Sequence, residues 1–68
     1  MNIEKARKLK LGDTVRCPSD RGAPAFIGKV SFIQPDLVNK NHVGEEYVWV
    51  NVSKNGKSAG VWPSNRLG

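Results

Sequence analysis

The chain has 68 residues, a net charge of +5 and one cysteine. A chain of this length forms a single domain and buries only ~60% of the surface that it exposes when unfolded, so its core is small. This leaves little room for a complete active site within one chain, and the pI of about 9.8 favours an anionic partner such as nucleic acid.

The only cysteine, Cys17, and the only histidine, His42, exclude an intrachain disulfide and a Cys/His zinc site. We therefore expect no metal and no cofactor, and we interpret Cys17 as a small buried residue on a strand. No apolar segment approaches the ~20 residues of a membrane span, and the N-terminal residues lack the apolar core of a signal peptide. A lone thiol suits a reducing compartment, so the sequence predicts a cytoplasmic protein without membrane association.

Residues 1–10 predict a short basic arm. Asn2 is placed to cap a helix and Ile3 and Ala6 recur at helical spacing, although ten residues form a marginal helix unless they are packed. Four bases minus one acid give this segment +3 of the total +5; the bases are Lys5, Arg7, Lys8 and Lys10. We expect the arm to be dispensable for the folding of residues 11–68.

From Gly12 onward apolar and polar residues alternate, which is the period of β-strands. Gly28 within the second strand indicates a bulge or a sharp bend. Segments 18–25 and 35–44 read as loops, Asn55-Gly56 predicts a type I′ hairpin turn, and a tight turn or a single 3₁₀ turn begins at Pro63. The predicted strands cover residues 14–17, 26–34, 47–52, 58–62 and 66–67.

Four or five short strands without room for a second sheet predict an all-β fold, in which one antiparallel sheet bends into a small barrel. Strict alternation over 47–52 directs Val48, Val50 and Val52 inward and directs Tyr47, Trp49 and Asn51 outward. The rest of the predicted core consists of Val15, Val30, Val61 and Leu67, together with Phe32 or Ile33.

The segment Leu11-Gly12-Asp13-Thr14-Val15-Arg16, with Gly28-Lys29-Val30 and Trp62-Pro63, resembles the SH3-like barrel superfamily, most closely its KOW and Tudor-like branches. These domains open with a hydrophobic-Gly-Asp-x-Val strand, and an aromatic residue followed by proline often precedes a 3₁₀ turn. The resemblance covers roughly residues 9–67 and implies a small β-barrel, but many functions share this fold. The ending 61–67 is also similar to small uncharacterised proteins of bacterial, phage and plasmid genomes.

The plasmid-borne type II dihydrofolate reductases are SH3-like barrels of similar length and require a separate comparison. They assemble as tetramers and carry their chemistry in a Val-Gln-Ile-Tyr segment followed by Pro, where this chain has Ala59-Gly60-Val61-Trp62-Pro63. Gly60 replaces the glutamine that contacts ligands, and glycine has no side chain to form a hydrogen bond. We therefore reject reductase activity as the leading interpretation and keep an oligomeric ligand-binding or reductase-like protein as a third alternative. The sequence also shows no nucleophile–base pair and no paired carboxylates, so we expect no catalytic residue and no enzyme.

Two functions stand ahead of that third alternative. The first is binding of DNA or RNA, in which cations neutralise phosphates and outward aromatic residues stack on bases; its candidate residues are Lys5, Arg7, Lys8, Lys10, Arg16, Arg21, Lys29, Tyr47 and Trp49. The second is a protein-interaction module for a host or phage protein, built on loop 18–25 and an aromatic groove; its candidates are Asp20, Arg21, Tyr47, Trp49 and Trp62. The aromatic residues also fit an internal cluster or a contact between copies, so the sequence leaves open a monomer or a small homo-oligomer.

Overall fold

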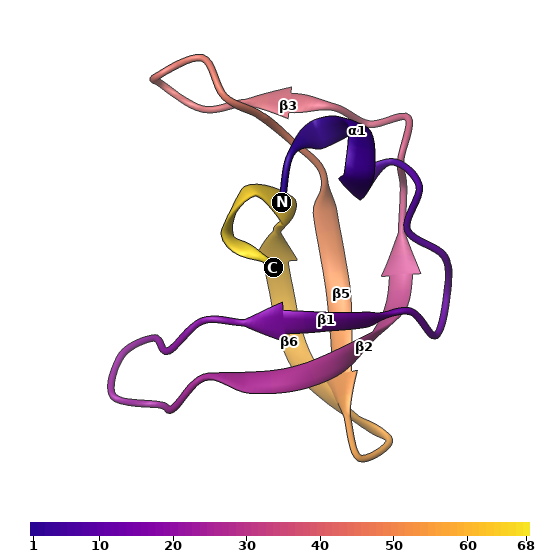
Figure 1. Cartoon of the computed structure of the whole chain (residues 1–68), viewed down its shortest axis with the longest axis vertical. Coiled ribbons are helices and arrows are strands. Elements are labelled where there is room, and N and C mark those ends of the chain that lie inside the picture. The colour runs from indigo at the N-terminus through magenta and orange to yellow at the C-terminus, as the bar shows by residue number, and fades with distance from the viewer.

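The computed structural model describes the whole chain, residues 1–68, as an all-β fold with one short α-helix (Figure 1). The strands form a four-stranded antiparallel sheet in the order β1-β2-β5-β6 and a separate two-stranded sheet, β3-β4. The elements in chain order are α1 (Ile3–Ala6), β1 (Thr14–Cys17), β2 (Phe26–Ile33), β3 (Asn39–Lys40), β4 (Glu46–Tyr47), β5 (Trp49–Lys54), β6 (Lys57–Pro63) and the 3₁₀ helix η1 (Ser64–Arg66).

The long strand β2 joins two layers. Its first half, Phe26 to Lys29, pairs with β1, and its second half, Lys29 to Ile33, pairs with β5. In Figure 1, β1 crosses in front of β5 and β6, and the molecule measures 31 × 26 × 15 Å. The core between the layers confirms most of the predicted positions; its buried apolar residues are Ala6, Val15, Cys17, Val30, Val48, Val50, Val52 and Leu67.

Gly28 lies where β2 passes close to β5. A Cβ atom at this position would stand 2.4 Å from Cγ1 of Val52 and 2.8 Å from the carbonyl oxygen of Ser53, so only glycine permits the approach. The register of β2 is regular through Gly28 and shifts further along, between Val30 and Phe32. The predicted bulge therefore exists, but it falls after Val30, while Gly28 allows the two layers to pack closely.

Two bulges decide which large apolar residues enter the core. The bulge in β2 turns Phe32 outward, 51% exposed, and Ile33 inward against the core. In β5–β6 pairing the register shifts beyond Asn51, next to Gly60, whose φ of +99° is open to glycine alone. Val61 lies opposite Asn51 and is 54% exposed, so its prediction as a core residue is wrong.

The four-stranded sheet does not close into a barrel, because β1 and β6 remain its two edges. One residue pair links the edge strand β1 to the end of the chain beyond η1: the N–H of Arg16 donates to the carbonyl of Gly68 at 2.9 Å, and the N–H of Gly68 donates to the carbonyl of Arg16 at 3.0 Å. The predicted strand at 66–67 is absent. The 3₁₀ turn after Pro63 is confirmed as η1, and it buries Leu67 beneath β1 and the other core strands.

Ser64 at the start of η1 fastens this turn to the chain between β4 and β5. Its N–H donates to the carbonyl of Val48 at 2.9 Å, and its Oγ accepts the N–H of Val48 at 3.0 Å. The amino group of Met1 donates to the carbonyl oxygens of Ser64, at 3.1 Å, and of Leu67. Because Val48 bonds to Ser64 and not to a strand, the single strand predicted over 47–52 is divided into β4 and β5.

Residues 1–10 are part of the packed domain. Asn2 caps α1, since its Oδ1 accepts the N–H of Lys5 at 2.8 Å, as the sequence predicts. Ala6 is fully buried, and Met1, Ile3 and Leu9 pack against the core. Removing this segment would uncover part of the core, so from the structure we expect its deletion to destabilise residues 11–68. No helix in the structure has the length and apolar character needed to cross a membrane.

Two hairpin tips share one turn geometry. Asn55 and Gly56 have φ values of +53° and +77°, which confirms the predicted type I′ turn. Arg21 and Gly22, at the tip of loop 18–25, have φ values of +46° and +82°. The flanking residues Asp20 and Ala23 exchange backbone hydrogen bonds of 3.1 and 2.8 Å, so this loop is an ordered hairpin end.

Candidate nucleic-acid interface

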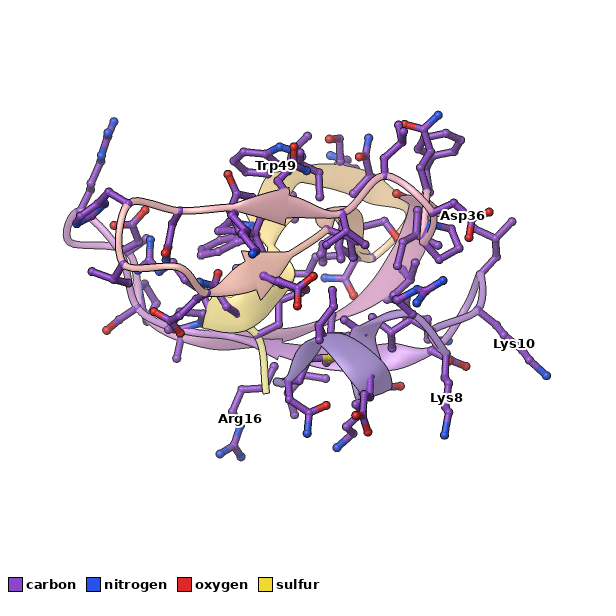
Figure 2. The ribbon with its side chains drawn as sticks, turned by 90° about the horizontal axis from the view of Figure 1, so that it is seen from above. Lys8, Lys10, Arg16, Asp36 and Trp49 are labelled. Carbon is purple, nitrogen blue, oxygen red and sulfur yellow. The ribbon has the colours of Figure 1, made fainter.

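Three of the predicted cations project from the same side of the molecule. Lys8 and Lys10 lie between α1 and β1, and Arg16 lies on the outward side of β1, where exposed and buried residues alternate. In Figure 2 all three side chains extend from the lower side, where α1 and β1 lie, and all three residues are exposed. We call Lys8, Lys10 and Arg16 the basic face. Lys5 is an exposed cation on α1 itself.

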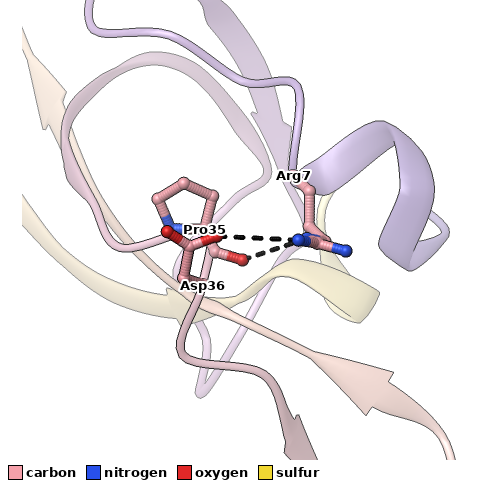
Figure 3. Close-up of polar contacts among 3 residues, drawn as sticks. All are labelled: Arg7, Pro35 and Asp36. Carbon is pink, nitrogen blue, oxygen red and sulfur yellow. Dashed lines mark hydrogen bonds and ion pairs between the residues drawn. The ribbon is translucent and has the colours of Figure 1, made fainter.

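Arg7 is engaged within the chain. Its Nε donates to the carbonyl oxygen of Pro35 at 3.2 Å, and its guanidinium lies 3.6 Å from the carboxylate of Asp36 (Figure 3). Both side chains are well exposed, so solvent screens the ion pair and its contribution to stability is small. The contact nevertheless neutralises part of the Arg7 charge, and it ties the end of α1 to the loop that follows β2.

Lys29 belongs to a second basic region. It pairs with Thr14 on one side and with Ser53 on the other, and the three residues line a hollow of about 260 Å³ together with Lys54 and Asn55. No carboxylate lines this hollow, and its hydroxyl, amide and ammonium groups can all donate hydrogen bonds. Lys54, which the sequence analysis did not select, also lies over the ring of Phe26, with 5.2 Å between Nζ and the ring centroid.

Arg21 stands apart from both basic regions. It occupies the tip of the hairpin between β1 and β2, which extends away from α1 in Figure 1. Of the seven predicted cations, the structure thus gathers Lys8, Lys10 and Arg16 on one side. It places Lys29 beside Lys54, pairs Arg7 with Asp36 and separates Arg21 from the others.

The aromatic side chains divide between two sides of the sheet. Tyr47 and Trp49 are in edge-to-face contact, with ring centroids 5.4 Å apart and planes at 88°. Trp49 is 48% exposed, and in Figure 2 it lies on the side opposite Lys8 and Arg16. A nucleic-acid segment held on the basic face therefore does not reach Trp49 directly.

Trp62 faces the interior and packs against the core while remaining partly exposed. Its ring packs edge-on against Phe26 at 6.1 Å, its Nε1 donates to the carbonyl of Ala59 at 3.0 Å, and the guanidinium of Arg66 lies 5.8 Å from the ring centroid. A hollow of about 260 Å³ is lined by Trp62, Asp20 and Arg66, among others. The structure thus brings Trp62 together with Asp20, as the protein-interaction hypothesis requires.

Tyr47 and Trp49 line a different hollow, of about 220 Å³, so the three aromatic residues do not form one groove. Arg66 borders both hollows and was not a candidate in the sequence analysis. The sequence predicted the turn that begins at Pro63, but the proximity of Arg66 to Trp62 depends on the path of η1, which the sequence did not predict.

Cys17 and His42 occupy different environments, one buried and one exposed. Cys17 is fully buried, as predicted, and this burial raises the pKa of its thiol. His42 is exposed in the loop between β3 and β4. No three His, Cys, Asp or Glu side chains are grouped as a metal-ligand set.

Comparisons of this chain with protein-family models, with curated proteins and with solved structures found no match. The function of this chain is therefore inferred from the fold and the surfaces described above.

Proposed function

We propose that this protein binds nucleic acid by contacting phosphates with its basic face, Lys8, Lys10 and Arg16. The observation that supports the proposal is the shared direction of these three exposed cations, which project from the α1–β1 side of a chain with net charge +5. Phosphate contacts from Lys and Arg supply sequence-independent affinity and weaken as salt rises. The lone thiol Cys17 suits a reducing compartment, and we place this binding in the cytoplasm.

The hollow around Lys29 supports a second phosphate contact. The ammonium groups of Lys29 and Lys54 line this hollow together with the hydroxyl groups of Thr14 and Ser53. No carboxylate lines it that would repel a phosphate. Arg16 and Lys29 lie on neighbouring strands, β1 and β2, and both belong to the outward sides of those strands. A backbone that crosses β1 can thus pass from the basic face toward this hollow.

The test is the binding of fluorescein-labelled, mixed-sequence DNA and RNA oligonucleotides, measured by anisotropy at about 50 and 200 mM salt. We expect binding that is weaker at the higher salt concentration and similar for different sequences. In the triple variant Lys8→Gln, Lys10→Gln, Arg16→Gln, the loss of three contacts should lower the slope of log K against log salt by roughly 2–3.

A matched variant controls for the loss of net charge. Lys40→Gln, Lys57→Gln and Arg21→Gln remove three exposed cations that lie on β3, β6 and the 18–25 hairpin. If the basic face is the site, this control should bind more tightly than the first triple variant. Equal losses in the two variants would show that only the net charge matters, and no salt-sensitive binding by the unmodified protein would overturn the proposed function.

A second candidate is recognition of a peptide by the hollow between loop 18–25 and β6. It is supported by the meeting of Asp20, Trp62 and Arg66 there, which offers an acidic group, an aromatic ring and a cation side by side. The test is capture of a partner from nuclease-treated host lysate by the unmodified protein and by Asp20→Asn. A partner that both proteins retain equally, or no partner at all, would remove this candidate.

A further inference from the structure

The side of the sheet opposite the basic face carries a group of exposed apolar residues. Phe32, Trp49 and Val61 come from three neighbouring strands and are 51%, 48% and 54% exposed. Leu37 and Val38, in the connection between β2 and β3, are 59% and 37% exposed. We call these five residues the uncharged face. Together they amount to most of the large apolar side chains that the molecule leaves exposed.

The uncharged face is continuous. Phe32 on β2 and Val61 on β6 stand on either side of Asn51 on β5, in one cross-strand row. Trp49 is two residues before Asn51 and therefore points to the same side of β5. Trp49 also lines a hollow of about 220 Å³ with Leu37 and Val38, which connects the sheet to the loop.

The five residues of this surface are uncharged, and the charged groups that border it are Arg66, beside Trp49 and Val61, and Asp20, beside Val61. The positions that complete the cross-strand rows are Asn51 and Pro63, and those that complete the hollow are Gln34 and Asn39. Lys8 and Arg16 lie on the opposite side of the molecule from Trp49 (Figure 2). Two chains of net charge +5 repel each other, but an approach through this face keeps their basic faces apart.

The exposed area is sufficient for the centre of a small interface. A buried aromatic side chain covers about 150–250 Å², so the five residues, exposed by roughly half, offer on the order of 500 Å². Apolar patches of about 300–600 Å² are the largest found on typical monomers and are often functional. A standard interface covers about 800 Å² on each partner, with an apolar centre and a polar rim that the surrounding amides would provide.

We infer that the uncharged face is the interface of a two-fold symmetric homodimer, in which a second copy of this chain covers it. Asn51 lies between Phe32 and Val61, and its amide both donates and accepts hydrogen bonds, so it can pair with Asn51 of a second copy at the two-fold axis. A nucleic acid is a poorer occupant, because the five residues offer its phosphates no cation and Arg66, at the border, lines its hollow together with the carboxylate of Asp20. The dimer turns both basic faces outward; only this last consequence rests on the proposed function.

The experiment is sedimentation equilibrium of nuclease-treated protein from about 10 µM to 1 mM, a range that covers weak interfaces of this size. We expect the mass to rise with concentration from 7.5 kDa toward twice that value. Association driven by apolar burial should persist or strengthen at high salt, because salt screens the repulsion between the two basic chains. A mass that stays monomeric up to 1 mM, or a dimer that dissociates in high salt, would overturn the inference.

Matched variants locate the interface. Val61→Lys and Phe32→Lys each place a cation on the uncharged face, opposite the same cation in the second copy, so both should remain monomeric across the range. Ile27→Lys is the control, because Ile27 is 61% exposed on the same strand as Phe32 but lies opposite Arg16, on the part of β2 that pairs with β1. Dimerisation that survives Val61→Lys and Phe32→Lys, or that Ile27→Lys abolishes equally, would refute this interface. Since nucleic acid is removed throughout, failure of the proposed function leaves this test unaffected.

Discussion

Replacing Ser64 with alanine tests whether one buried hydroxyl group holds η1 against the chain between β4 and β5. Ser64 is fully buried, its Oγ accepts the N–H of Val48 at 3.0 Å, and its own N–H donates to the Val48 carbonyl at 2.9 Å. Alanine retains the second hydrogen bond and removes the acceptor of the first. The N–H of Val48, a residue with 0% exposure, is then left without its partner.

The expected magnitude follows from the cost of that unpaired group. A buried N–H that loses its acceptor costs about 1–3 kcal/mol. A domain of 68 residues has a free energy of unfolding on the order of 3–10 kcal/mol, so the substitution removes a large fraction of it. Because 1 kcal/mol corresponds to roughly 4–8 °C in Tm for a domain of this size, we expect Tm to fall by roughly 10 °C.

The assay is urea unfolding followed by tryptophan fluorescence, with amide hydrogen exchange at Val48 as a local measurement. The midpoint should fall while the m-value stays constant, because the surface exposed on unfolding hardly changes. Ser19→Ala, at an exposed loop position, is the control and should stay within about 0.5 kcal/mol of the unmodified protein. If Ser64→Ala is as stable as this control and Val48 keeps its protection, the hydroxyl does not hold the junction.

Three further predictions concern Gly28, Arg21 and Cys17. Gly28→Ala should lower the free energy of unfolding by more than about 2 kcal/mol or prevent folding, because the Cβ of the alanine would lie 2.4 Å from Cγ1 of Val52. A circular-dichroism melting curve identical to that of the unmodified protein would contradict this close approach. Arg21→Asn should raise stability by a few tenths to about 1 kcal/mol, because asparagine tolerates the φ of +46° at this type I′ position better than arginine does; a lower Tm would show that the arginine side chain contributes more than its backbone strain costs. Burial raises the pKa of Cys17 above its ordinary value of 9.0, so the unfolded chain loses the thiol proton first and the free energy of unfolding should fall as pH rises above about 9. In Cys17→Ala the fall between about pH 8 and pH 10 should be shallower, and an equal slope would assign the effect to other groups.

Local patterns predicted several elements correctly because their cause lies within a few residues. Alternation over 47–52 places Val48, Val50 and Val52 inward, and all three are fully buried. Asn55-Gly56 forms the type I′ turn because both residues accept positive φ. Asn2 caps α1 because its side chain reaches the N–H three residues ahead.

Predictions that depended on pairing between strands were less successful. Phe32 and Val61 share the apolar character of the core residues, but both are outward because bulges shift the register of β2 against β5 and of β5 against β6. A one-residue shift moves a side chain to the other face of a sheet, and the shift is defined by both strands together. Within the uncharged face, the alternation of a single strand therefore predicted the outward direction of Trp49 but not that of Phe32 or Val61.

The sequence by itself determined the all-β fold, the hairpin turns, the buried Cys17 and the concentration of charge in residues 1–10, because composition, period and turn chemistry act locally. Only the tertiary structure decided that Ala6 anchors this segment in the core, that Arg7 pairs with Asp36, and that Trp49 lies opposite the basic face. These relations join residues far apart in the chain, and they arise because β2 pairs with β1 through its first half and with β5 through its second half, while Gly28 allows the two layers to pack closely. The exposed cations Lys8, Lys10 and Arg16 thus lie on one side of the molecule and Trp49 lies on the other, and this separation is what the two proposed binding surfaces depend on.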